Sequence, residues 1–383
     1  MTVKDTNVTE NVPQKDPRRT DAMKKTQRIE AIMEVVRIVA GMAIAYLLAL
    51  VILVAISDDP VFIVKQFILG PFSSPRRIGS IINLAVPFTL CGLSMCFMYA
   101  VNKFNLIGES IFMLSGCIIT WVALAIGQNL PAVILVPLLL LIGAVVGAVL
   151  SFIPAIMDRK LNANVVVVSL MLNSVIVQLA IYILRYYMKD PGISFIGSYE
   201  LPKQIQFVTL FGKMKIGAGV IIAAIAVVIV SIIFFKTSFG WKMRIVGSNP
   251  KFATAVGLSA LGISFTAQLA GGALAGIAGA TEIMNSYKRF QWTASTGHGF
   301  DGLLVAVLAK KNPILVPVGA LFLAYVRIGA DVVNTSGDIP YEFISVIQGI
   351  IILLVAAESF LSGFKNRLIY KSVQAENANQ KSA

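Results

Sequence analysis

The sequence predicts an all-α integral membrane protein with about ten transmembrane helices, some of them broken or half-length. Of its 383 residues, 57% are apolar and only 13% are charged, whereas roughly 25% of residues in a soluble protein are charged. Apolar runs of about 20 residues, the length at which a helix spans a bilayer, recur along the chain. Lys and Arg residues gather in the tails and in short loops between these runs.

The apolar runs define the predicted spans in order. The first seven are expected at residues 38–57 and 78–102, twice within the uncharged stretch 110–157, and at 161–184, 216–235 and 257–281. The stretch 110–157 is too long for one helix, and Gly127 and Pro131 are expected to divide it. The eighth element, 302–309, is so short that we expect a half-length helix. Residues 312–326 and 343–357 complete the ten.

The distribution of positive charge predicts that both termini are cytoplasmic. Ten alternating spans place 21 Lys and Arg residues on the cytoplasmic side and 10 on the outside, which is the asymmetry that membrane proteins show. The predicted organisation is a cytoplasmic tail at 1–35, a transmembrane domain at 36–357 and a second cytoplasmic tail at 358–383. The longest outer segment, 185–215, is expected to form a cap or a re-entrant piece.

Several functional classes are excluded at this stage. The net charge of +13 follows membrane topology, so no nucleic-acid partner is expected. Three cysteines without a CxxC spacing, and a single histidine, indicate neither a disulfide framework nor a metal site. A phosphate-binding GxxxxGK[ST] loop is absent, and no nucleophile–base pair is visible. We therefore expect a transport subunit that is not an enzyme and binds no cofactor itself.

The cytoplasmic loop 236–257 carries the clearest local signal. Asn249 is a good N-cap and Pro250 suits the first turn of a helix, where its missing N–H has no partner in any case. A short helix is expected at 250–256, and Gly257 supplies the backbone freedom to end it. Such a helix between two spans is suited to contact with a soluble partner protein. The alternative is a structured loop that binds no partner.

This loop resembles the permease subunits of ABC importers for nucleosides, simple sugars and branched-chain amino acids. The family pattern R-x-x-G-x-N-P-x-x-A-x-x-x-G is matched by Arg244, Gly247, Asn249, Pro250, Ala253 and Gly257. Further matches are Gly297-His-Gly299-Phe-Asp301-Gly302, then Asn312-Pro313, and, upstream, Asn105, Gly108 and Glu109. The upstream pattern departs from the family at Lys103, at the inserted Leu106 and in lacking Gly-Gln after Glu109. The resemblance covers about residues 84–356, and Pro87 to Leu93 favour the nucleoside branch.

The resemblance implies a function and a set of partners. It implies a cell-membrane permease that imports nucleosides by alternating access, with the loop 236–257 docked on an ABC ATPase subunit that holds ATP and Mg²⁺. A second permease subunit, expected to be a different chain, and an external substrate-binding protein complete the assembly. Simple sugars such as ribose or galactose are the alternative cargo. An ion-coupled secondary transporter fits the broken spans but leaves the capped loop unexplained.

Polar residues inside the spans are costly, so each is a candidate for the substrate pathway. The candidates are Asn83, Asn105, Glu109, Asn173, Gln268, Glu282 and Asp301, and Gln178 also lies within a span. Interhelical hydrogen bonding is the competing explanation for each of them. Glu109 and Asp301 are favoured because they lie where the predicted spans are interrupted and the sequence matches the family patterns. Helix ends at such interruptions leave backbone groups unpaired. Phe290 and Trp292 offer either a stacking face or part of an interfacial aromatic belt.

Small residues are spaced as GxxxG in two predicted spans. Gly143 and Gly147 form one pair, and Gly272 and Gly276 form the other. Glycines at this spacing let helix backbones approach closely in lipid. We expect both pairs to serve helix packing.

Overall fold

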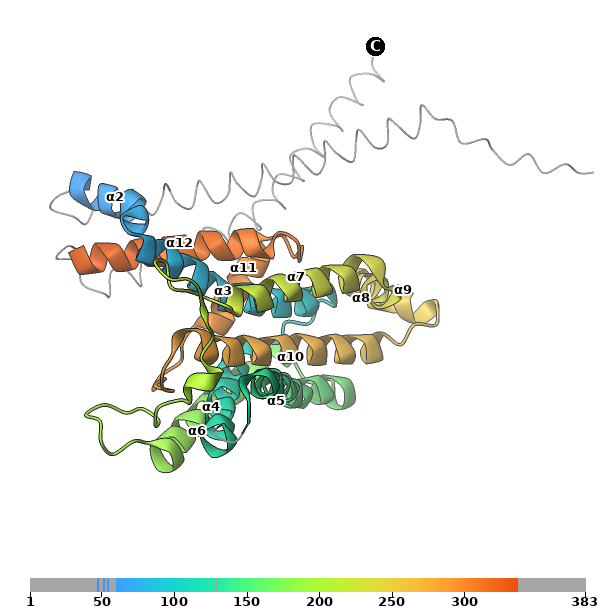
Figure 1. The fold of residues 1–383 in the computed structure, drawn as a ribbon. Coiled ribbons are helices and arrows are strands. Elements are labelled where there is room, and N and C mark those ends of the chain that lie inside the picture. Colours follow the sequence, from blue (N-terminus) through green and yellow to red (C-terminus); the bar gives the residue numbers. More distant parts are fainter. Residues whose placement is uncertain (1–46, 48–50, 52–53, 55–59, 128–129, 337–383) are drawn as a thin grey trace, which may run out of the picture.

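Long helices run side by side through the computed structural model, which describes residues 60–127 and 130–336 together with Leu47, Val51 and Val54 (Figure 1). Seven of the described helices are long and apolar enough to cross a membrane. They are α3 (Pro75–Ala100), α4 (Gly108–Ile126), α5 (Ala132–Leu161), α6 (Val165–Ile183), α7 (Gly219–Lys236), α10 (Ala260–Ser286) and α12 (Val316–Ser336). Each coincides with a predicted span. The predicted spans at 38–57 and 343–357 and both tails lie largely or wholly outside the described residues, so the count of ten stays a prediction.

Shorter elements connect these helices. They are α2 (Pro60–Leu69) with the 3₁₀ turn η1 (Gly70–Phe72), the π turn η2 (Leu184–Met188), the 3₁₀ turn η3 (Lys203–Ile205), the strands β1 (Thr209–Phe211) and β2 (Ile216–Gly217), α8 (Ser238–Ser248), α9 (Pro250–Ala255) and α11 (His298–Leu308). The two strands pair antiparallel. The half-length element expected at 302–309 is α11, which begins four residues earlier than the apolar run.

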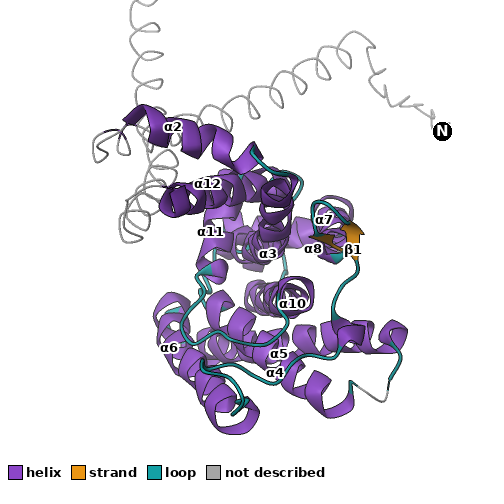
Figure 2. Ribbon diagram, turned by 60° about the vertical axis from the view of Figure 1, so that its left-hand side comes forward, coloured by secondary structure: helices purple, strands orange, loops and turns teal. Residues whose placement is uncertain are grey.

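Two helices form the centre of the bundle. In Figure 2, α10 is seen nearly end-on between α3 and α5, and it packs on α5, α3 and α4. α3 in turn packs on α11, α12 and α7 as well as on α10. Most residues of α3 from Gly79 to Met98 are buried, as expected for a helix that is apolar on every face. The elements that carry the candidate site are therefore attached to a shared α3–α10 core.

The two GxxxG motifs face each other across the α5–α10 contact. A Cβ atom at Gly276 would overlap the carbonyl group of Gly143, and one at Gly147 would overlap that of Gly272. The prediction that these glycines serve packing is confirmed. Close backbone approach replaces the hydrophobic driving force that is missing between helices in lipid.

The loop 236–257 holds two helices where one was expected. α9 begins at Pro250 as predicted, but α8 precedes it directly. Thr237 caps α8, since its hydroxyl accepts a hydrogen bond from the Gly240 N–H at 3.3 Å. Figure 1 places α8 and α9 at one end of the bundle and the α6–α7 connection at the other.

The connection after α6 is pinned to the connection between α10 and α11. The Ser198 N–H donates to the Phe290 carbonyl at 2.9 Å and the Leu201 N–H to that of Lys288 at 2.9 Å. The Arg289 guanidinium pairs with Asp190 at 2.6 Å and donates to the Ser198 carbonyl at 3.2 Å. The segment thus forms a cap, one of the two arrangements expected for it.

Replacing Gly276 by Leu is expected to disrupt the α5–α10 contact, because the added side chain has no space between the two backbones. Overpacking typically costs about 1–3 kcal/mol, so the melting temperature of the purified protein in detergent should fall by several degrees. Gly212→Leu is the matched control, since no atom lies within 4 Å of a Cβ at that position. Equal melting temperatures for the two variants would contradict the packing role.

The Asp190–Arg289 pair is expected to make the cap sensitive to acid. Hydrogen bonds from Arg289 and from the Gly192 N–H lower the pKa of Asp190. The stability it contributes is therefore fully present above its ordinary pKa of about 3.9 and is lost as the pH falls through the lowered value. The protection of residues 189–199 against hydrogen exchange, corrected for the intrinsic exchange rate at each pH, should fall at that pH in the native protein. In Asp190→Asn, the corrected protection should not respond to the same titration.

Candidate functional site

Two helices begin at the same place inside the bundle. α4 starts at Gly108 after the coil 101–107, in which Asn102 adopts a left-handed conformation with φ 53°. α11 starts after Gly297, whose φ of 78° suits glycine far better than other residues. A Cβ at Gly299 would overlap the backbone of Gly108 and Glu109. The first turns of the two helices are therefore in direct contact.

Glu109 joins these two helix starts. Its side chain is 0% exposed. One carboxylate oxygen accepts hydrogen bonds from the Ser295 hydroxyl at 2.7 Å, the Thr296 hydroxyl at 3.0 Å and the Gly297 N–H at 2.7 Å. The other oxygen accepts from the Gly299 N–H at 2.8 Å. The carboxylate is stabilised here because the start of α11 directs the Gly297 and Gly299 N–H groups and the positive end of its helix dipole toward it.

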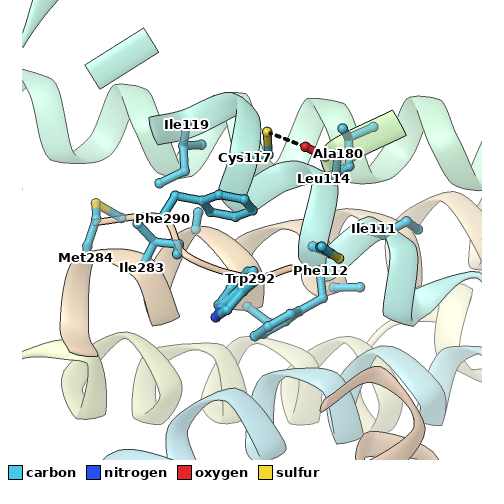
Figure 3. Packing of buried hydrophobic residues seen from close by; sticks show 14 of the residues in the cluster. Ile111, Phe112, Leu114, Cys117, Ile119, Ala180, Ile283, Met284, Phe290 and Trp292 are labelled. Carbon is cyan, nitrogen blue, oxygen red and sulfur yellow. Dashed lines mark hydrogen bonds between the residues drawn. The ribbon is translucent and has the colours of Figure 1, made fainter. Parts of the chain in front are cut away.

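Aromatic rings line the interior beside this carboxylate. The Phe112 ring stacks on Trp292 at 5.1 Å and on His298 at 5.0 Å between ring centroids. Phe88 on α3 continues the series, at 5.5 Å from His298. Figure 3 shows Trp292 alongside Phe112, with the indole nitrogen turned away from Phe290. These rings form an apolar wall shared by α3, α4, α11 and the connection that precedes α11.

An ion pair links the first turn of α11 to α12. Arg327 on α12 contacts Asp301 at 2.6 Å, and its guanidinium lies over the Phe88 ring at 5.4 Å. The pairing neutralises a carboxylate that is buried in the first turn of α11. Nothing in the sequence around Arg327 marks it as the partner of Asp301, so its role appears only in the fold.

Asn105 and Gln268 belong to a second polar network, which anchors the coil before α4. The Asn105 amide donates to the Gln268 side-chain carbonyl at 3.1 Å and to the Ser151 hydroxyl at 3.3 Å. Ser151 donates to the Gln268 backbone carbonyl at 2.8 Å. Nearby, Lys103 pairs with Asp158 at 2.7 Å. The coil is thereby tied to both α5 and α10.

Asn173 and Asn83 also have structural partners. The Asn173 carbonyl accepts from the Ser110 N–H at 2.7 Å and so helps to satisfy the start of α4. Asn83 donates to the Lys215 carbonyl at 2.9 Å and accepts from the Gly217 N–H at 3.0 Å. These contacts hold the β1–β2 hairpin over the ends of α3 and α10.

The structure thus separates the predicted pathway residues into two groups. Asn83, Asn105, Glu109 and Asn173 have hydrogen-bond partners, and Asp301 Oδ2 has the Arg327 guanidinium as an ion-pair partner. Among the described residues, the buried side-chain atoms without a hydrogen-bond partner are Ser231 Oγ, Gln268 Nε2, Thr281 Oγ1, Glu282 Oε2, Trp292 Nε1 and Asp301 Oδ2. A buried polar atom left unpaired costs free energy, so Gln268 and Glu282 are the predicted pathway residues with an atom that has neither a hydrogen bond nor an ion pair within the described chain. Substrate contact itself stays a prediction for all seven residues.

The loop residues matched to the family pattern have defined local roles. Asn249 accepts from the Phe252 N–H at 3.0 Å, as expected of the N-cap, and Gly257 ends the helix with φ 83°. Gly247 packs directly on the Ala100 backbone at the end of α3, and the Arg244 guanidinium lies 5.8 Å from the Phe235 ring centroid. Ala253 is 0% exposed, so it packs within this chain.

Three large apolar side chains are exposed on the otherwise polar surface of α8 and α9. Phe252 on α9 is 54% exposed, Val256 directly after α9 is 59% exposed, and Trp241 on α8 is also exposed. None of the three belongs to the family pattern, which marks residues that shape the loop, so the pattern does not reveal them. Exposed aromatic side chains on a polar surface are the usual mark of a protein contact.

The site offers stacking faces, hydrogen-bonding groups and fixed charges. In the described part of the chain, no group of three or more His, Cys, Asp or Glu residues is placed to hold a metal ion. The groups that are present suit the binding of a small polar molecule, and no covalent chemistry is suggested by their arrangement.

Replacing Glu109 by Gln is expected to destabilise the protein. An amide nitrogen would replace one carboxylate oxygen and would face hydrogen-bond donors on either side. Loss of charge-assisted hydrogen bonds in a buried setting typically costs about 1–3 kcal/mol, which a thermal melt in detergent can resolve. Glu200→Gln is the control, since Glu200 is exposed and lies 3.8 Å from Arg289. A melting temperature equal to that of the control would refute this account of Glu109.

Known proteins resemble this chain over most of its length. Residues 77–356 match the family described as branched-chain amino acid transport system, permease component. The glucose ABC transporter permease protein TsgB13 of Haloferax volcanii is 30% identical over 82% of this chain and 85% of its own length. The nucleoside ABC transporter permease protein NupB of Lactococcus lactis is 29% identical, covering 93% and 98%. The guanosine ABC transporter permease protein NupP of Bacillus subtilis is 29% identical, covering 81% and 88%.

No solved structure is significantly similar to this chain. The sequence relationships are sufficient for the family, since the match extends through the Glu109 site, α9 and α11. The seven apolar helices agree with a protein of the cell membrane. The chain belongs to the family of branched-chain amino acid transport system permease components and is an ABC transporter permease.

Proposed function

We propose that this chain is the transmembrane permease subunit of an ABC importer for nucleosides. The observation that supports the cargo most directly is the similarity to nucleoside and guanosine permeases over more than four-fifths of the chain. The aromatic wall of Phe112, Trp292 and His298 adds physical support, because a flat heterocycle stacks well on such rings. Simple sugars are the second candidate, since a glucose permease is similar to the same extent.

Energy is supplied by a partner in this proposal. The sequence has no phosphate loop, so ATP and Mg²⁺ are assigned to a separate ABC ATPase subunit. The α8–α9 loop, with its exposed Phe252 and Val256, is the surface that docks on that subunit. A second permease and an external substrate-binding protein complete the transporter.

A displacement of α9 is expected to be transmitted to the interior of the bundle through closely packed helices. Gly247 at the end of α8 packs on the end of α3, and α9 leads directly into α10. These two helices form the core of the bundle, and both border the Glu109 site. Alternating access then requires only that the core and the α4–α11 junction tilt against each other when the ATPase closes.

The proposed topology has ten spans with both termini in the cytoplasm. The permease domain covers residues 36–357, between the tails 1–35 and 358–383, and its loop 236–257 faces the cytoplasm. The Lys103–Asp158 pair supports this arrangement, because it joins two segments that the charge distribution places on the same side. The pathway is assigned to the interior polar residues, with Gln268 and Glu282 the best placed.

Replacing Phe252 and Val256 by Asp is expected to abolish ATP-dependent uptake of radiolabelled nucleosides in cells that express the complete transporter. Both side chains are exposed, so the protein should still reach the membrane at its normal level. The physical reason is the desolvation of two carboxylates at an apolar contact, which costs several kcal/mol unless they are paired.

Val208→Asp is the matched control, because Val208 is exposed on the opposite, outer segment. It should transport at the rate of the unmodified protein. Normal uptake by the Phe252/Val256 variant would remove the coupling role from α9. Uptake that is abolished by an ionophore and persists without an ATPase would replace the proposal with an ion-coupled transporter.

A further inference from the structure

Two of the unpaired polar atoms in the interior have complementary chemistry. Glu282 on α10 is 4% exposed, and its Oε2 has no hydrogen-bond partner among the described residues. Trp292 is also buried, and its Nε1–H likewise has no partner there. A carboxylate oxygen accepts hydrogen bonds and an indole N–H only donates them. Together they offer one acceptor and one donor that the protein leaves unused.

Neighbouring contacts place these two groups in the same region. A Cβ at Gly116 would meet both Trp292 and Ile283, the residue that follows Glu282. Tyr287 packs edge-on against Trp292 at 5.5 Å between ring centroids. The Tyr287 phenol also lies close to both Trp292 and Glu282. The end of α10 and the connection to α11 therefore place the donor and the acceptor in the same part of the interior.

The surroundings are suited to a flat ring. Trp292 stacks on Phe112, which in turn stacks on His298. The Glu282 carboxylate also lies close enough to Cys91 on α3 to interact with it electrostatically, as do Glu109 and Asp301. Glu109 is held by hydrogen bonds and Asp301 by its ion pair with Arg327, so of these three carboxylates Glu282 is the one with an oxygen that has neither kind of partner among the described residues.

We infer that Glu282 and Trp292 form a recognition site for the edge of a nucleobase. A base edge carries an N–H donor next to an acceptor, which matches a carboxylate beside an indole N–H. In inosine or uridine, the ring N–H would donate to Glu282 and the adjacent carbonyl oxygen would accept from Trp292. The face of the same ring would stack on the aromatic side chains of Phe112, Trp292 and His298.

A sugar fits this site less well. Each hydroxyl of a monosaccharide needs partners once it leaves water, and the site has only a few unpaired polar atoms. A nucleobase instead presents two apolar faces and a short polar edge. The inference rests on the proposed function and names the part of the nucleoside that the permease reads.

The test uses the complete transporter in proteoliposomes. Its binding protein is saturated with each compound, so that the selectivity of the binding protein does not affect the measured transport rates. Transport rates are compared for inosine and 1-methylinosine, in which a methyl group replaces the ring N–H. The unmodified protein should favour inosine by about tenfold or more, since the methylated ring leaves the buried carboxylate unpaired. In Glu282→Ala this ratio should fall toward one.

Two further variants separate recognition from misfolding. Glu282→Gln keeps an acceptor oxygen and should keep part of the preference for inosine. Trp292→Phe keeps the ring but removes the donor, so it should slow both compounds and leave their ratio unchanged. Ser231→Ala is the control, because Ser231 Oγ is another buried, unpaired atom but lies on α7. It should match the unmodified protein in both rates.

The outcomes distinguish the two proposals. If the unmodified transporter imports inosine and 1-methylinosine equally, or if Glu282→Ala keeps the full preference, the recognition site is refuted while the nucleoside importer stands. If no nucleoside is imported at all while a sugar is, the proposed function fails and the base-recognition site fails with it. A ratio that collapses only in the Glu282 variants supports the inference.

Discussion

The hydrogen bonds of the Glu109 carboxylate are the constraint on which the interior depends. Inside a bilayer, no water is available to satisfy the first N–H groups of a helix, so a helix that begins there needs a protein acceptor. One carboxylate supplies it to α11 while standing in the first turn of α4. Because a residue of α4 satisfies the N–H groups at the start of α11, the irregular backbone at 287–297 is held against the first turn of α4. That backbone sets the positions of the Trp292 and His298 side chains.

Much of the architecture is readable from the order of residues. The long helices follow the apolar runs, the cap at Asn249 follows from side-chain chemistry, and the facing GxxxG motifs follow from the need for close contact in lipid. α8 was missed because its cap, Thr237, precedes a short segment with no apolar periodicity. The eighth element began earlier than expected because its first turn, from His298 to Asp301, is polar.

The site was only partly predictable, and the reason is distance along the chain. Glu109 was chosen as a candidate for substrate contact, but its partners Ser295 to Gly299 lie almost 190 positions away, and no local pattern reveals that they surround it. Arg327 escaped notice for the same reason, since only the fold brings it to Asp301. Conversely, Glu282 looked no different in sequence from the other polar residues. It stands out in three dimensions because its neighbours leave one of its oxygens unpaired.

The pinning of segment 189–201 onto residues 288–290 has a mechanical consequence. The Ser198 N–H donates to the Phe290 carbonyl, and the Phe290 N–H donates to the Ser198 hydroxyl. Trp292, two positions further on, stacks on Phe112. A displacement of segment 189–201 would therefore be transmitted to Trp292 and Phe112 through adjoining backbone, with no relay of side chains between them.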